Sequence, residues 1–135
     1  MFIAIALVLA SPPTLADAFV RTGTWVVAGS TPEREVFVDT GHLQRIGSEV
    51  LVRQISVYRE PEPVRGALEA LDAMVYHCVD RTYSLVAAAG RGPDGSIIYA
   101  GPVAPGERRA AAIAPGTIAA GVFDLVCRSS GRAPS

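Results

Sequence analysis

The two cysteines are the residues of this chain best able to do chemistry, because a thiol pair can form a disulfide, bind a metal or supply a nucleophile. They are Cys78 and Cys127, and the chain has no others. The chain starts with an apolar stretch that predicts export, and two lone cysteines in an oxidising compartment usually pair. We therefore expect one disulfide, which contributes about 4 kcal/mol in the chain-entropy model.

Metal binding and nucleophilic catalysis are the alternative uses of these side chains. A metal site would combine His77, Cys78, Asp80 and Cys127, but adjacent residues of a strand point to opposite faces, and a disulfide removes both thiolates. For catalysis the chain offers two imidazole bases, His42 and His77, without a G-x-S-x-G motif. We therefore expect no metal, no cofactor and no enzymatic activity.

Residues 90–95, Gly-Arg-Gly-Pro-Asp-Gly, match the G-x-G-x-x-G pattern of dinucleotide-binding loops. Such a loop needs a following helix whose first amides face the pyrophosphate. Here residues 96–99 favour a strand, and Pro93 lacks an amide hydrogen. The motif therefore predicts a hairpin turn.

Six aromatic or basic residues are candidates for contact with a ligand or partner. They are Trp25, Tyr76, Arg81, Tyr83, Arg108 and Arg109. The three rings would line a pocket if the domain carried a small molecule. Arg81 could pair with a carboxylate, and the Arg108-Arg109 pair could touch an anionic partner. The default interpretation is core for Trp25 and solvated surface for the arginines.

The candidate residues should lie mainly on strands or next to them. Strands are expected because β-branched and aromatic residues recur in short runs between turn signals. The expected strands are 23–28, 35–39, 50–59, 73–79, 82–90 and 96–100, with a last short one at 108–113. A short helical turn is expected at 40–45, and 64–72 is expected to be mostly irregular. Near the end, Thr117 is a plausible N-cap, and apolar residues at 118, 122, 125 and 126 form one helical stripe.

The first eighteen residues predict a signal peptide, with an apolar run at 2–10 and an A-x-A cleavage signature at 16–18. The run is too short to span a bilayer. We expect a single mature domain at 19–128 and a flexible tail at 129–135. Without Asp17, twelve arginines balance twelve acidic residues, so the net charge of zero disfavours nucleic acid as a partner.

The placed residues resemble the surface-adhesin protein E-like domain of exported Gram-negative proteins. The matching features are Trp25, Phe37-Val38-Asp39, Leu43, Arg45-Ile46-Gly47, the long strand at 50–58, Cys78 followed by Arg81, and Pro115-Gly116-Thr117 leading to Cys127. The resemblance implies an α+β fold: a twisted antiparallel sheet of about six strands, with a C-terminal helix held on its concave face by the Cys78–Cys127 disulfide.

The expected function is a non-enzymatic envelope protein, periplasmic, secreted or at the cell surface, that acts as an adhesin-like protein-binding module. Its partner would be an unknown host or envelope protein, or a second copy paired through an edge strand. The alternative is a periplasmic carrier of a small molecule or lipid, with the ligand held between sheet and helix. An enzyme or enzyme inhibitor is the third hypothesis.

Overall fold

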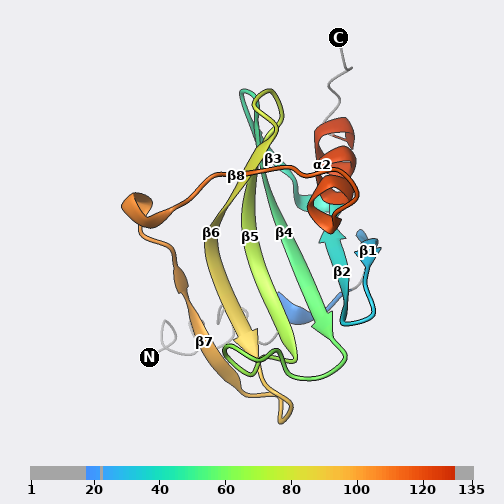
Figure 1. Ribbon diagram of the computed structural model, residues 1–135, viewed down its shortest axis with the longest axis vertical. Helices are drawn as coiled ribbons and strands as arrows, with labels where there is room; N and C mark the ends of the chain where they lie inside the picture. Colours follow the sequence, from blue (N-terminus) through green and yellow to red (C-terminus); the bar gives the residue numbers. More distant parts are fainter. Residues whose placement is uncertain (1–17, 22, 130–135) are drawn as a thin grey trace, which may run out of the picture.

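The computed structural model describes residues 18–21 and 23–129, which contain one curled antiparallel sheet and a C-terminal helix (Figure 1). In chain order the elements are β1 (Trp25–Ser30), β2 (Arg34–Asp39), η2 (Thr40–His42), β3 (Gln44–Ile46), β4 (Glu49–Tyr58), β5 (Glu69–His77), β6 (Thr82–Arg91), β7 (Ile97–Pro102), η3 (Pro105–Glu107), β8 (Ala111–Ala112) and α2 (Ile118–Ser129).

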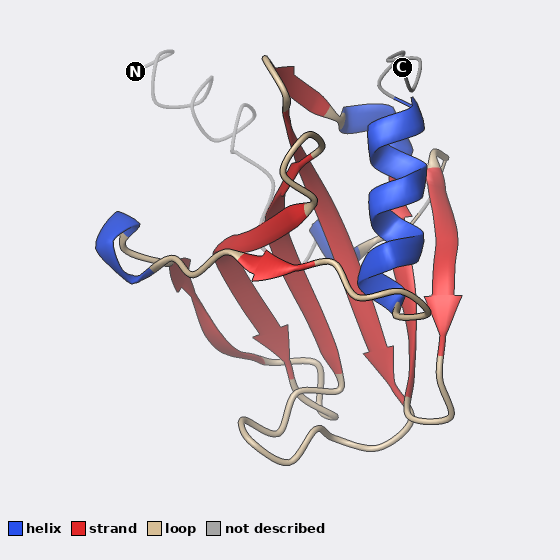
Figure 2. Ribbon diagram, turned by 45° about the horizontal axis from the view of Figure 1, so that its top comes forward, coloured by secondary structure: helices blue, strands red, loops and turns tan. Residues whose placement is uncertain are grey.

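The main path of the sheet runs in the order β1-β2-β4-β5-β6-β7, and every neighbouring pair is antiparallel. The short strands β3 and β8 pair with the first residues of β4 and β6. Helix α2 lies against the concave face (Figure 1, Figure 2). The expected α+β architecture is therefore confirmed.

The two faces of the sheet have separate cores, because successive side chains of a strand point to opposite sides. The larger core lies between the sheet and α2, and its buried members are Val36, Val38, Val50, Val52, Met74, Tyr76, Ile113, Val122, Phe123 and Val126. The smaller core lies on the convex face, where Phe19, Ile55 and Ala89 are buried beside Trp25, Val57 and Leu71. Phe19, the expected first residue of the mature chain, is thus packed onto the sheet.

Helix α2 forms where the apolar stripe predicts it, and Thr117 caps it by accepting a hydrogen bond from the amide of Ala120 at 3.2 Å. Val122 and Val126 are completely buried. Gly121 lowers helix propensity, but it lies so close to β1 that an added Cβ would come within 3.0 Å of the Ala28 carbonyl oxygen. The helix therefore gains its stability from packing on the sheet.

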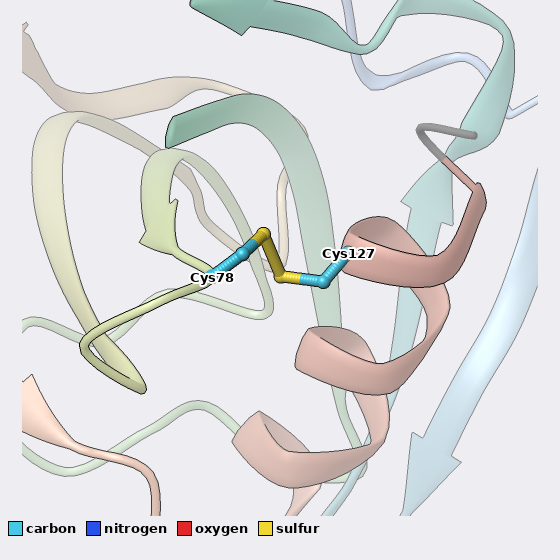
Figure 3. Close-up of a disulfide and its surroundings, with 2 residues drawn as sticks. All are labelled: Cys78 and Cys127. Atoms are coloured by element: carbon cyan, nitrogen blue, oxygen red, sulfur yellow. A yellow bond between two sulfur atoms is a disulfide. The ribbon is translucent and has the colours of Figure 1, made fainter. Parts of the chain in front are cut away.

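The disulfide joins the end of the sheet to the end of the helix. Cys78 follows β5 directly and Cys127 lies in the last turns of α2, with their Cα atoms 5.7 Å apart (Figure 3). The expected Cys78–Cys127 bridge is confirmed, and neither thiolate is available to a metal.

The hairpin expected at 90–95 is also present. Gly95 has a φ of 85°, which favours glycine, and the Asp94 carboxylate accepts hydrogen bonds from the amide and the hydroxyl of Ser96. The glycines therefore serve a turn between β6 and β7.

Three predicted boundaries were wrong. Only Thr40–His42 forms a helical turn, because Gln44–Ile46 pairs with β4 through a turn at Gly47. Strand β5 begins at Glu69 instead of residue 73, since its first residues pair with both β4 and β6. The last strand contains only Ala111–Ala112.

Most of the predicted signal peptide and tail lies outside the described residues, although Ser129 still belongs to α2. In the described part of the chain, no helix is long and apolar enough to cross a membrane.

Candidate functional site

Helix α2 covers only part of the concave face, and the far halves of β4, β5 and β6 extend beyond it (Figure 1, Figure 2). Strand alternation places four polar residues on this face, in phase with the valines and Met74 of the larger core. We call them the concave polar cluster: Arg34 from β2, Gln54 and Ser56 from β4, and Asp72 from β5.

Most members of the concave polar cluster are held by hydrogen bonds. Arg34 Nη1 donates to the hydroxyl of Ser56 at 3.1 Å, and its guanidinium lies 6.0 Å from the ring centroid of Tyr58. The hydroxyl of Tyr76 donates to Gln54 Oε1 at 3.1 Å. Ser56 is completely buried and Gln54 is 8% exposed. These contacts fix the cluster as part of the folded sheet.

Asp72 differs from the rest of the cluster. Among the described residues its carboxylate makes no hydrogen bond and no ion pair. Burial raises the pKa of its carboxyl to about 6, and the nearby charges of Arg34 and Arg65 only partly oppose that effect. A half-buried carboxylate without a bonded partner costs folding free energy, and such groups are typical of functional sites.

A cavity of about 540 Å³ opens between the first turn of α2, the β1–β2 turn and the sheet. Arg34 and Tyr83 line it from the sheet side. The remaining lining consists of hydroxyl-bearing and small residues: Ala28, Gly29, Ser30, Thr31, Ala112, Ala114, Gly116, Thr117, Ile118 and Ala119. The cavity therefore combines one cation, several hydroxyls and a small apolar wall, which offer polar contacts to a small ligand.

The structure brings together only two of the three predicted rings. Tyr76 and Tyr83 stack on the concave face with ring centroids 5.6 Å apart. Trp25 packs on the convex side beside Phe19, and the guanidinium carbon of Arg53 lies 5.7 Å from the centroid of its ring. A single pocket lined by all three rings is therefore not formed.

The three predicted arginines are not members of the concave polar cluster, and two of them have structural contacts of their own. Arg81 has a φ of 56°. Its guanidinium lies 4.6 Å from the ring centroid of Phe123, so the side chain packs on α2, and none of the ion pairs among the described residues includes it. Arg108 donates from Nε to the Val103 carbonyl at 3.1 Å, and Arg109 is exposed.

The sequence reasoning missed all four members of the concave polar cluster. A readable signal was present, because Gln54 and Ser56 follow Val50 and Val52 in the same strand phase. Asp72 similarly precedes Met74 and Tyr76, so three polar residues occupy inward positions of central strands.

Asp39 is the centre of a second polar group, at the end of β2. Its carboxylate is 1% exposed and accepts from Thr24 Oγ1 at 2.7 Å, the Gly41 amide at 3.2 Å and Arg53 at 2.5 Å. His42 Nδ1 lies 2.8 Å from Oδ2, the oxygen that also accepts from Arg53. Asp39 thus caps η2, and the group ties the residue before β1 to β2, η2 and β4.

The second histidine joins a row of polar side chains across three strands. His77 Nδ1 lies 3.1 Å from Glu49 Oε2, and its Nε2 lies 3.4 Å from Ser84 Oγ. The row has the residue types of an acid, a base and a nucleophile, but strand phase places it on the convex face, away from the cavity. We assign it no catalytic role.

Asp39→Asn is expected to lower the free energy of unfolding by about 2 kcal/mol at pH 7, because it weakens charged hydrogen bonds. Burial alone would raise the pKa of Asp39, but the bonds from Thr24, Arg53, Gly41 and His42 outweigh it and hold that pKa below its usual value. Its stabilising effect is therefore present above pH 4 and lost as the pH falls. Urea unfolding between pH 7 and pH 2 should show that the free energy of unfolding falls less with acid in the variant than in the wild type. Equal pH profiles would contradict this prediction.

The fold and its polar concave face define the chain as a small α+β domain whose C-terminal helix is tied to a curled sheet by one disulfide. The family model described as surface-adhesin protein E matches residues 25–128, and the chain belongs to this family. The family resemblance is thereby confirmed, and membership indicates an exported or cell-surface, adhesin-like protein that interacts with other proteins. No curated protein and no solved structure matches the chain.

Proposed function

We propose that this protein is a non-enzymatic, exported interaction module that binds a protein partner through an open edge of its sheet. The observation that carries the proposal is the family match, which spans nearly the whole described domain. A host or envelope protein, or a second copy of the chain, would be the partner. Localisation in the periplasm or at the cell surface belongs to the same proposal.

Strand β7 is the edge best suited to such contact. In the described part of the chain it pairs with β6 alone, so its outer backbone groups remain open to another strand. Ile97 and Ile98 on it are 36% and 43% exposed. At the opposite edge, β1 also exposes Val26 and Val27, but α2 packs beside it. Addition of a partner strand to β7 would combine backbone hydrogen bonds with burial of the isoleucines.

Ile98→Lys tests this edge. The change should reduce partner binding at least tenfold, because it places a charge in the apolar contact and disfavours strand addition. The measurement is quantitative crosslinking of tagged, natively exported protein followed by identification of the bound chains. Val64→Lys is the matched control, since Val64 is 86% exposed and lies in the β4–β5 connection.

Equal crosslinking by the wild type and Ile98→Lys would contradict the β7 edge, and the absence of any specific partner would contradict the module itself. A crosslink between two copies that Ile98→Lys abolishes would identify the chain as its own partner. Fractionation of the same sample, with N-terminal sequencing, tests export and the expected first residue Phe19.

The carrier alternative is favoured by one observation, the cavity lined by Arg34 and Tyr83 between α2 and the sheet. Native mass spectrometry of the exported protein tests it directly. A retained small molecule would favour a carrier, and its loss in a variant that fills the cavity, such as Ala114→Trp, would place the ligand there.

A further inference from the structure

Two opposite charges on the concave face are left without a salt-bridge partner. None of the ion pairs among the described residues includes Arg34 or Asp72. In contrast, the carboxylates of Asp39 and Glu69 on the convex face are each paired with arginines. Arg34 on β2 pairs in register with Tyr58, and Asp72 on β5 pairs with Gln54, so the two charges lie on the same face on either side of β4, yet the fold does not join them.

The surroundings of the two charges provide both room and apolar surface. Arg34 borders the cavity of about 540 Å³, together with the ring of Tyr83. Beyond Asp72, the ring of Tyr99 lies over Gly90, where an added Cβ would come within 2.1 Å of it, and Arg65 stacks 4.4 Å above that ring. The concave face therefore presents Arg34 and Asp72 beside aromatic rings, and Arg65 is held against the ring of Tyr99.

We propose that the concave face binds a small zwitterion of the amino-acid class, with its carboxylate on Arg34, its ammonium on Asp72 and its side chain in the cavity. The inference does not depend on binding of a protein partner at β7, because Arg34 lies on β2 and Asp72 on β5, whereas the proposed partner strand adds to the outer edge of β7. It concerns a site that family membership does not assign.

The physical case for a zwitterion rests on charge matching. A guanidinium presents a planar fork of donors that fits a carboxylate, and Arg34 uses one nitrogen on Ser56. A simple anion would be attracted by Arg34 but repelled by Asp72. A simple cation would be attracted by Asp72 but repelled by Arg34. A ligand that carries both charges satisfies both groups at once, which neither single charge can do.

Binding is first tested by thermal shift and calorimetry at pH 7.5 with each of the twenty free amino acids. Analogues of the best binder then separate its two charges: the N-acetyl derivative keeps the carboxylate alone, and the amide keeps the ammonium alone. The intact zwitterion should bind at least tenfold tighter than either analogue. If no free amino acid binds, or if the analogues bind as well as the zwitterion, the proposal is overturned.

Two substitutions assign the charges to their residues. Arg34→Gln should weaken the zwitterion and the N-acetyl analogue at least tenfold, and should leave the amide almost unchanged. Asp72→Asn should weaken the zwitterion and the amide, and should leave the N-acetyl analogue unweakened. Arg128→Gln and Asp124→Asn are the controls, because both residues are exposed and lie outside the cavity. If all four variants bind as the wild type does, the assignment is wrong.

A second readout is the pH dependence of binding. The charged groups that act on Asp72 are Arg34 from β2 and Arg65 from the β4–β5 connection. The phenols of Tyr76 and Tyr99 face the same region and stay neutral, since burial raises the pKa of each. Affinity for the zwitterion should therefore fall when the pH drops from 7.5 to 5, and the fall should vanish in Asp72→Asn. A pH-independent affinity in the wild type would exclude a salt bridge to Asp72.

Discussion

Cys127→Ser is expected to lower the free energy of unfolding by about 4 kcal/mol, because the bridge closes a loop of 49 residues in the unfolded chain. The loss should appear first in α2, whose C-terminal end is tied to the sheet through Cys78 (Figure 3). The central strands β4 and β5 are paired on both sides and should keep their protection longer.

Hydrogen exchange measures this difference residue by residue, and urea unfolding gives the total. The double variant Cys78→Ser/Cys127→Ser should behave like the single one, since each removes the same bond. If exchange in the whole sheet became faster by as much as exchange in α2, the disulfide would not act mainly on the helix, and the prediction would be contradicted. An unchanged free energy of unfolding would contradict the bridge as a stabilising feature.

Asp72→Asn is expected to change stability in the opposite direction and raise the free energy of unfolding at pH 7 by up to about 3 kcal/mol. The pKa of Asp72 is raised by burial from 3.8 to about 6, so ionisation in the folded domain costs free energy. The wild type should therefore lose stability as the pH rises from about 4 through 6, whereas the variant should not.

Urea unfolding at pH 3.5, 5 and 7 tests the second prediction, with Asp124→Asn as the control on the exposed surface of α2. The wild type and Asp72→Asn should have similar stabilities at pH 3.5 and diverge at pH 7. A variant less stable than the wild type at pH 7 would mean that Asp72 stabilises the fold. A variant more stable than the wild type at pH 7 would instead support the view that the Asp72 carboxylate is retained for binding, at a cost in stability.

The successful predictions rest on local signals. The Pro-Asp-Gly turn, the cap at Thr117 and the apolar stripe of α2 each depend on residues a few positions apart, whose chemistry is readable in order. The strand limits were less predictable because pairing with neighbours decides them. Glu69 joins β5 through its partners Val57 and Arg91, which lie far away in the sequence.

The candidate site was less accessible to sequence reasoning for the same reason. Arg34, Ser56 and Asp72 are separated along the chain and meet only because β2, β4 and β5 are neighbours in the sheet. Their inward phase was readable, but the phase alone does not reveal where α2 stops covering the face. The predicted rings were separated for a related reason, since Trp25 belongs to the opposite strand phase from Val26 and Ala28.

By itself the sequence determined the disulfide, the C-terminal helix and the hairpin turn at 90–95, because these follow from cysteine count, periodicity and short-range turn chemistry, and it determined the family through residues matched along nearly the whole domain. Only the tertiary structure decided which polar residues share the uncovered concave face and leave Arg34 and Asp72 without an ion pair. The physical reason is that strand order and helix placement are set by packing between distant segments, and those contacts bring the two charges to one surface.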